Sequence, residues 1–194
     1  MENHPTKTKP KIKAVVFDMH GVVLKIDLGQ WYRYVPYYAY LISDKLAKIL
    51  GEHETPAHKQ EKLDRHLKCY NGWDRLDTGV AEIIKSLKSA NYVTVALSNM
   101  PTDHADTNRM LGYYDNFDYT ILSSEVGHSK PDRRIFNKVE KVTGIRPENC
   151  LYFDDFFVNI LAARAYGFNA ELYTHLFDSP KKMRAVLDRY GVKF

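Results

Sequence analysis

The chain has 194 residues, enough to bury one principal hydrophobic core with a modest appendage but too few for two large independent domains. Hydrophobic residues make up 44% of it, charged residues 27% and aromatic residues 13%, which excludes an intrinsically disordered protein. The formal net charge of +4 is small and the two signs are interspersed along the chain, which argues against a nucleic-acid partner.

The cysteines and the apolar segments indicate where in the cell the protein is expected to be. Cys69 and Cys150 are far apart and have no companions at the spacing of a disulfide framework or a zinc site. Met1 to Lys13 is polar and basic, unlike a secretory signal, and no apolar stretch approaches the roughly 20 residues of a membrane span. We therefore expect a cytoplasmic protein with no membrane partner.

The first predicted strand follows a polar N-terminal segment. Residues 1–12 combine prolines and lysines without apolar periodicity, which predicts a disordered basic lead-in. Lys13 to Phe17 is a short β-branched apolar run that stops at Asp18, as a strand buried on both faces would. Gly21 then predicts a turn.

Residues 27–73 are predicted to form a small α-helical cap inserted after this strand. Two helical stretches are separated by the polar segment Gly51 to His58. In the first stretch, aromatic residues recur at helical spacing (Trp31, Tyr34, Tyr38). Such a stripe either packs within the cap and against the main domain or lines an apolar substrate pocket, and the sequence leaves both alternatives open.

From residue 74 onward, strands and helices alternate. Strands are predicted at Tyr92 to Leu97, Tyr119 to Leu122 and Cys150 to Phe153. Apolar residues at helical spacing predict the intervening helices: Val80, Ile83, Ile84 and Leu87; Ile135, Val139 and Val142; Ile160, Leu161, Ala163 and Ala165. This alternation predicts an α/β fold, a Rossmann-like doubly wound parallel sheet formed by residues 13–26 and 74–194.

Polar side chains able to do chemistry follow three of the four predicted strands. They are Asp18, Ser98 and the pair Asp154 and Asp155. Open α/β sheets place their sites outside the carboxyl ends of the strands, so these groups are expected to converge. Lys130 precedes Pro131, which can begin a helix and leave the lysine facing the same edge.

Four motifs in this order resemble those of the haloacid dehalogenase-like hydrolase superfamily. They are Val15 to Val23 around Asp18, Leu97-Ser98-Asn99, Gly127 to Asp132 around Lys130, and Tyr152 to Asp155 followed by Asn159, Ala162, Ala163 and Gly167. The resemblance extends from about Lys13 to Phe168. It implies a hydrolase with a Rossmann-like main domain and a cap that closes the site.

The resemblance also implies roles for individual residues. Asp18 would be the nucleophile that attacks a phosphate ester and forms an aspartyl-phosphate. The expected Mg²⁺ ligands are the side chains of Asp18, Asp154 and Asp155 and the backbone carbonyl of His20, all of them the hard oxygen donors that this ion prefers. The expected phosphate-binding groups are Ser98, Asn99 and Lys130, the lysine also balancing the charge of the carboxylate.

The same residue types also have structural roles. A carboxylate after a strand can cap the next helix, which is an alternative for Asp18 and, at the helix predicted near Phe156, for Asp155. Ser98 can be a turn residue and Lys130 a solvated lysine. The convergence of four motifs favours the functional interpretation for all of them.

His20 departs from the phosphatase pattern. Family phosphatases resemble Asp-x-Asp in the first motif, and the second aspartate serves as general acid and base. A histidine, whose ordinary pKa is about 6.5, can exchange a proton with a leaving alcohol and with water. An imidazolium beside Mg²⁺ is electrostatically unfavourable, so His20 equally indicates a weakened or inactive site.

The preferred function is therefore Mg²⁺-dependent hydrolysis of a small phosphorylated metabolite, with Asp18, His20 and Lys130 in catalytic roles. One alternative is a dehalogenase-like or other hydrolase acting at carbon, which needs no metal. Another is a catalytically weakened relative that binds a phosphorylated ligand or a protein partner. The motifs are generic in their handling of phosphate, and they specify neither the substrate nor the oligomeric state.

Overall fold

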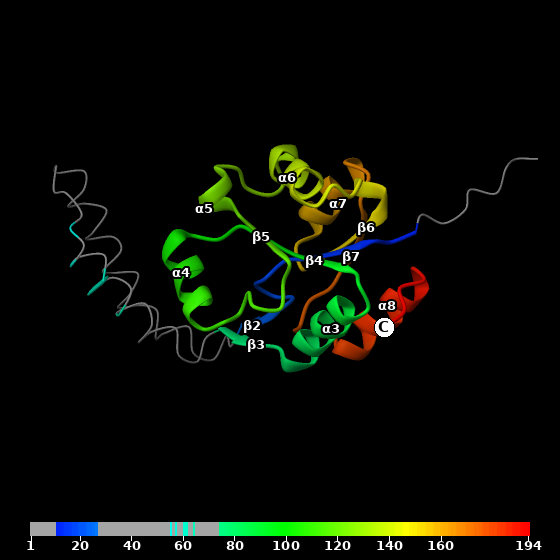
Figure 1. The fold of residues 1–194 in the computed structure, drawn as a ribbon, viewed down its shortest axis with the longest axis horizontal. Coiled ribbons are helices and arrows are strands. Elements are labelled where there is room, and N and C mark those ends of the chain that lie inside the picture. The colour runs from blue at the N-terminus through cyan, green and yellow to red at the C-terminus, as the bar shows by residue number, and fades with distance from the viewer. Residues whose placement is uncertain (1–10, 27–54, 56, 58–59, 62–63, 65–73) are drawn as a thin grey trace, which may run out of the picture.

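The structure is a computed structural model that describes residues 11–26, 55, 57, 60–61, 64 and 74–194 (Figure 1). A parallel five-stranded sheet forms its centre, in the order β5-β4-β1-β6-β7. The strands are β1 (Ala14–Phe17), β4 (Val93–Ser98), β5 (Tyr119–Leu122), β6 (Cys150–Asp154) and β7 (Asn169–Leu172). The predicted α/β fold with a doubly wound parallel sheet is confirmed.

Helices cover both faces of this sheet. α3 (Thr78–Ser89) and α8 (Pro180–Arg189) lie on one face, and α6 (Arg133–Thr143) and α7 (Phe157–Ala165) lie on the other (Figure 1). The remaining helical elements within residues 74–194 are α4 (Thr102–Met110), α5 (Ser123–Val126) and the 3-10 helix η2 (Pro147–Asn149). None of the described helices is long and apolar enough to cross a membrane.

The strand β1 shows why the sheet needs two helical layers. All four of its residues are buried, and they alternate between the two hydrophobic cores. Val15 and Phe17 face the core that contains α3 and α8, whereas Ala14 and Val16 face the core that contains α6. A strand that is apolar on both sides is stable only between two such layers.

A two-stranded antiparallel ribbon follows β1. Gly21 adopts a φ of 80°, and its amide donates to the carbonyl of Leu24, which turns the chain into β2 (Leu24–Ile26). β2 pairs with β3 (Asp74–Leu76), so the chain leaves and re-enters the main domain at one place. The helical cap predicted for residues 27–73 lies outside the described residues, apart from a few isolated positions, and stays a prediction.

The folded domain includes two residues of the predicted lead-in. Residues 1–10 of the predicted lead-in lie outside the described residues. Lys11 and Ile12, which the prediction placed in that lead-in, belong to the folded domain. Ile12 is buried, and the side-chain amide of Asn149 donates to the carbonyl of Lys11 over 2.8 Å.

Several element boundaries also differ from the sequence prediction. α6 begins at Arg133 and not at Pro131, because the carboxylate of Asp132 caps it by accepting from the amide of Arg134 over 2.8 Å. Leu161 and Val142 are 50% and 42% exposed, although both matched the helical apolar pattern. β7 was missed because only its Ala170 is fully buried, as befits an edge strand.

Candidate active site

The polar groups predicted at the strand ends do converge at the carboxyl edge of the sheet. β1 lies between β4 and β6, and Asp18 follows β1 directly with its amide donating to the carbonyl of Phe153 over 2.9 Å. Ser98 and Asp154 are the last residues of the two flanking strands. All three side chains belong to buried residues, with Asp18 8% exposed and Asp154 fully buried. The sheet therefore gathers these groups at a single place.

Lys130 forms ion pairs with carboxylates that follow or end two neighbouring strands, β1 and β6. Its ammonium lies 2.8 Å from Oδ1 of Asp18, 2.8 Å from Oδ2 of Asp154 and 3.0 Å from the carbonyl of Leu97. Burial alone would lower the pKa of Lys130, but the two carboxylate charges outweigh it and raise that pKa. The three N–H donors are all engaged by the protein, so toward an anion Lys130 offers only its charge.

Asn99 holds Lys130 in place. Its side-chain oxygen accepts from the amide of Lys130 over 2.7 Å, and its side-chain nitrogen donates to the carbonyl of the same residue over 2.9 Å. The Lys130–Pro131 peptide bond is cis. The side chain of Asn99 thus binds the backbone of Lys130, while the phosphate-binding role predicted for the backbone near Asn99 stays a prediction. Ser98 is 1% exposed beside it.

Asp154 is the most heavily hydrogen-bonded group of the site. Oδ2 accepts from Lys130 and from the hydroxyl of Tyr152, and Oδ1 accepts from the amide of Phe156 over 2.7 Å. The side-chain amide of Asn159 lies 3.1 Å from both oxygens. A carboxylate has about four acceptor positions, so these four donors satisfy Asp154 completely. α7 has Phe156 at its N-cap and no side-chain hydrogen bond caps it, so the helix-capping role considered for Asp155 is not observed.

Asp155 stands differently from Asp154. It is only partly buried, and its carboxylate lies over Gly21, where a β-carbon added to the glycine would come within 2.0 Å of Oδ2. Burial, followed by the negative charges of Asp18 and Asp154, raises the pKa of Asp155 to about 6. Gly21 thus gives Asp155 the room to lie beside the turn that follows Asp18.

The three carboxylates form a group that fits a divalent cation. Asp18, Asp154 and Asp155 each offer an oxygen within 4.8 Å of the others. Three carboxylates lie around the single ammonium of Lys130, so the cluster carries excess negative charge. Burial and the charge of Asp154 raise the pKa of Asp18, although Lys130 acts in the opposite direction. Hard oxygen donors with unbalanced negative charge suit Mg²⁺.

His20 has a histidine neighbour that the sequence prediction did not include. The rings of His20 and His104 contact edge to face, with centroids 6.1 Å apart. His104 lies in the first turn of α4, which follows the Ser98 motif. Because α4 has a weak apolar pattern, nothing in the sequence placed His104 next to a motif more than 80 positions away.

The predicted site residues fall into two groups in space. Ion pairs and the carboxylate cluster bring together Asp18, Lys130, Asp154 and Asp155, and Asn99 joins them through the backbone of Lys130. Ser98 and His20 lie on the adjoining segments. Tyr152 was missed as a participant, although its spacing of two residues from Asp154 on a strand places both side chains on the same face.

Comparison with known proteins agrees with the observed fold and identifies the family. Residues 12–167 match the family model of the haloacid dehalogenase-like hydrolases. A predicted HAD-like family hydrolase from Porphyromonas gingivalis is 21% identical, with 91% of this chain and 98% of that one covered and a TM-score of 0.68. A HAD phosphatase from Thermococcus onnurineus is 19% identical, with 91% and 98% covered and a TM-score of 0.65.

A HAD family enzyme from Bacteroides thetaiotaomicron, in complex with magnesium and inorganic phosphate, is 20% identical, with 86% of this chain and 100% of that chain covered and a TM-score of 0.62. The likeness to these solved structures concerns the fold. The family model spans most of the chain, including all four motifs. The chain belongs to the haloacid dehalogenase-like hydrolase family.

Proposed function

We propose that this hydrolase cleaves phosphate monoesters, with Mg²⁺ as cofactor, through an aspartyl-phosphate on Asp18. The observation that carries this proposal is the position of Lys130, which lies 2.8 Å from both Asp18 and Asp154. A buried ammonium between two carboxylates, with a third carboxylate beside them, forms a charged site suited to an anionic substrate and a cation.

In the first step, an oxygen of Asp18 attacks phosphorus while the bond to the leaving alcohol breaks. Oδ1 of Asp18 accepts from Lys130 and, over 2.7 Å, from the amide of Met19. Oδ1 is engaged by these two donors, and we assign the attack to Oδ2. The positive charge of Lys130 reduces the repulsion between the carboxylate and the phosphate dianion.

Proton transfer is assigned to His20. Its imidazolium donates a proton to the departing alkoxide, and the resulting imidazole takes a proton from the water that hydrolyses the aspartyl-phosphate. The products are an alcohol, inorganic phosphate and regenerated Asp18. His104 is close enough to pack against the His20 ring and limit its orientations.

We propose Asp18, Asp155 and the backbone carbonyl of His20 as the Mg²⁺ ligands. Asp154, which the sequence also predicted as a ligand, already accepts hydrogen bonds from four protein donors. When bound, this ion supplies positive charge that screens the nucleophile from the phosphate and stabilises the developing negative charge. Ser98, the backbone near Asn99 and the charge of Lys130 would bind the phosphoryl oxygens.

Two relatives support the choice among the functions of the family. The Bacteroides thetaiotaomicron enzyme binds magnesium and inorganic phosphate, and the Thermococcus onnurineus protein is described as a phosphatase. We propose a small phosphorylated metabolite as substrate and no nucleic-acid or membrane partner. The cytoplasmic location stays a prediction.

The decisive experiment measures hydrolysis of p-nitrophenyl phosphate with Mg²⁺ and with EDTA. Wild type, Asp18→Asn and His20→Asp are compared at equal concentrations of folded protein. Metal-dependent turnover that is lost in Asp18→Asn supports the proposal. Turnover that continues in EDTA, or in Asp18→Asn, contradicts it.

His20 is the observation that favours a second candidate, a weakened relative that binds phosphorylated ligands without turning them over. This candidate predicts no hydrolysis by wild type, gain of hydrolysis in His20→Asp and thermal stabilisation of wild type by inorganic phosphate. The hydrolase acting at carbon predicts release of halide from a haloacid in the presence of EDTA.

A further inference from the structure

Tyr152 and Asp154 lie on the same face of β6. Side chains alternate along a strand, and the cores confirm the alternation here. Cys150 and Tyr152 face the core that contains α6, whereas Leu151 and Phe153 face the opposite one. The phenol of Tyr152 therefore stands beside the carboxylate of Asp154, and its hydroxyl donates to Oδ2.

The ring of Tyr152 is held rigidly. The residue is fully buried, and Phe136 of α6 packs edge to face against it with centroids 5.7 Å apart. The ammonium of Lys130 lies 5.8 Å from the centre of the same ring. Tyr152 thus contacts both partners of the Lys130–Asp154 ion pair, one through its hydroxyl and the other through its π face.

The acceptor positions of Asp154 decide what this contact does. Lys130, Asn159 and the amide of Phe156 supply three donors, and Tyr152 supplies the fourth. A carboxylate with four donors has no lone pair left for a cation. Without the phenol, one acceptor position would open on Oδ2 of Asp154, the oxygen that also accepts from Lys130.

We propose that Tyr152 is a positioning residue whose hydroxyl keeps Asp154 bound to Lys130 and away from the metal, so that Asp18 and Asp155 are left to hold the cation. The proposal rests on the proposed function for its kinetic consequence but not for its metal-binding consequence. The proposal gives the adjacent residues Asp154 and Asp155 different roles. Asp154 orients the lysine, and Asp155 faces the metal.

The test is Tyr152→Phe, which keeps the buried ring and removes only the hydroxyl. Mg²⁺ binding is measured by isothermal titration calorimetry, and p-nitrophenyl phosphate hydrolysis is measured across Mg²⁺ concentrations. We expect Mg²⁺ to bind at least about fivefold more tightly, because Asp154 gains a free acceptor for the ion. We expect kcat to fall about tenfold with KM within about twofold, because Lys130 loses its fixed partner.

Tyr190→Phe is the matched control. The hydroxyl of Tyr190 donates to Oε1 of Glu171 over 2.6 Å, so this variant also removes a phenol from a carboxylate, but next to α8 and β7, away from the cluster. Its Mg²⁺ affinity and kcat should equal those of wild type. Circular dichroism of each variant confirms that equal amounts of folded protein are compared.

A purely structural role for Tyr152 predicts a different result, namely weaker Mg²⁺ binding together with slower turnover. Unchanged or weaker Mg²⁺ binding in Tyr152→Phe overturns the proposal. The effect must also act through Asp154, so Tyr152→Phe should leave the Mg²⁺ affinity of Asp154→Asn unchanged. If wild type proves inactive, the proposed function fails, while the calorimetric comparison still decides the role of Tyr152.

Discussion

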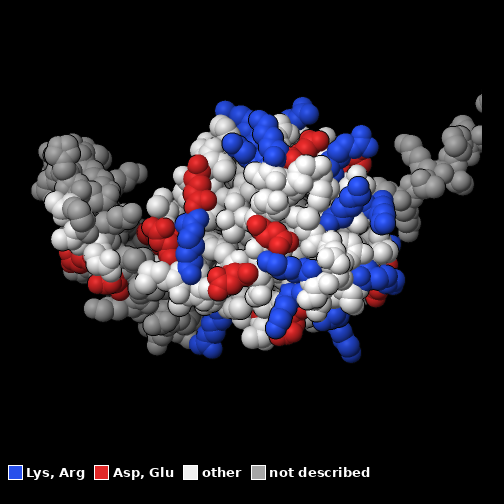
Figure 2. Space-filling model, in the orientation of Figure 1, with Lys and Arg blue, Asp and Glu red and all other residues white. Residues whose placement is uncertain are grey.

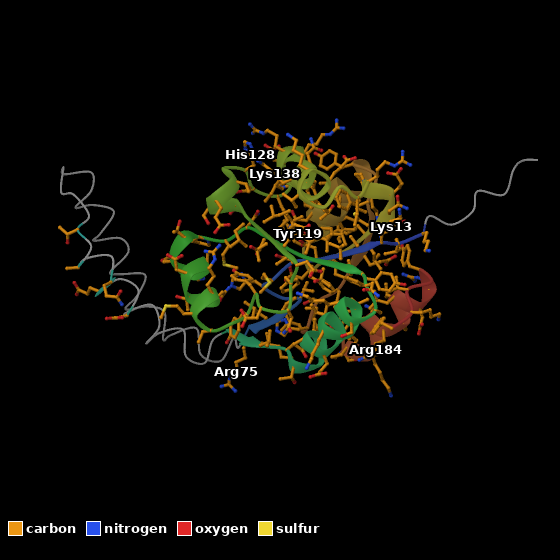
Figure 3. All side chains as sticks on the ribbon, in the orientation of Figure 1. Lys13, Arg75, Tyr119, His128, Lys138 and Arg184 are labelled. Atoms are coloured by element: carbon orange, nitrogen blue, oxygen red, sulfur yellow. The ribbon has the colours of Figure 1, made fainter. Side chains whose placement is uncertain are left out.

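Lysines lie at both ends of the strands of the parallel sheet, but the amino edge and the carboxyl edge differ in how these lysines are buried and paired. At the amino edge, Lys11 and Lys13 border a hollow of about 460 Å³ that is also lined by Asn91, Val93 and Ile145. Both lysines are exposed. At the carboxyl edge, Lys130 is 5% exposed and its ammonium lies between two carboxylates. Lys13 is labelled in Figure 3 at the start of β1, and His128, close in sequence to Lys130, lies toward the opposite end of the sheet.

The difference shows that burial and convergence, more than the presence of charge, define the candidate site. Lysines and arginines are spread over the visible surface and alternate with acidic residues, with no large area of a single sign (Figure 2). An exposed lysine is surrounded by water and exerts a screened field. The same group placed among buried carboxylates acts at short range in a low dielectric.

The largest expected effect comes from Lys130→Met, compared with Lys13→Met at the opposite edge. Lys130→Met leaves two buried carboxylates without their cation, which should cost about 3–5 kcal/mol in the free energy of unfolding and reduce kcat by about 10²–10³-fold. Lys13→Met should stay within about 0.5 kcal/mol and retain activity. Urea unfolding and phosphate release measure both. Equal destabilisation of the two variants would remove the distinction between the edges.

Comparing Gly21→Ala with Gly144→Ala should distinguish the effect of backbone strain from that of a clash with Asp155. The new β-carbon would meet Asp155 at 2.0 Å, so Asp155 must move and Mg²⁺ affinity should fall about 10–100-fold. Gly144→Ala is the control, because Gly144 also has a positive φ, 68°, but a β-carbon added there would meet nothing within 4 Å. Both variants should lose about 1–2 kcal/mol of stability from the left-handed conformation. Calorimetry with Mg²⁺ should detect a change in Gly21→Ala alone.

The pH dependence of stability should reveal the crowded carboxylates in metal-free protein. The pKa of Asp155 is raised to about 6 from 3.8, so the folded state holds this proton more tightly than the unfolded state does. Its contribution is therefore fully present below pH 3.8 and is lost as the pH rises through about 6. After allowance for solvent screening of a partly exposed group, we expect a loss of about 1–2 kcal/mol.

Asp155→Asn isolates this contribution, since other carboxylates titrate in the same range. The difference in unfolding free energy between Asp155→Asn and wild type, measured in EDTA, should increase in favour of the variant between about pH 4 and pH 7. A difference in unfolding free energy that does not change with pH would show that the neighbouring carboxylates do not raise the pKa of Asp155. Saturating Mg²⁺ should reduce the effect.

The smallest expected effect concerns Tyr173, which follows β7. Its amide donates to the carbonyl of Asp154, but its buried hydroxyl has no hydrogen-bond partner among the described residues. Tyr173→Phe should therefore raise the unfolding free energy by up to about 1 kcal/mol, because it removes an unsatisfied polar atom. Tyr152→Phe, which removes a satisfied hydroxyl, should not stabilise the fold. Thermal unfolding of the two variants gives the comparison.

Much of the fold could be predicted because the central strands are apolar on both faces. The central strands β1, β4 and β6, and also β5 at one edge of the sheet, were expected within one or two residues of their observed bounds. β7 was not expected, since an edge strand exposes one side and its sequence, Asn169–Leu172, alternates polar and apolar residues over only four positions. The ribbon β2–β3 was missed because its strands are 47 residues apart in sequence and three residues long.

The residues of the site could be predicted from motifs, but their division of labour could not. Sequence spacing places Asp18, Lys130, Asp154 and Asp155 at one edge. It does not show that the side chain of Asn99 holds the lysine backbone or that Asp154 is saturated by four donors. Those contacts depend on side-chain direction and on packing across strands, which become defined only when the sheet and its helical layers are assembled.

The pairing of β2 with β3 has a consequence for how this protein can vary. Because Ile26 and Asp74 are registered partners, the two ends of the intervening segment are fixed side by side, whatever its length or sequence. Asp77 connects the β2–β3 ribbon to the main domain. Its amide donates to the carbonyl of Val23, and its carboxylate pairs with Lys25 at 3.1 Å. We therefore expect insertions, deletions or replacements between the two strands to leave the position of Asp18 unchanged.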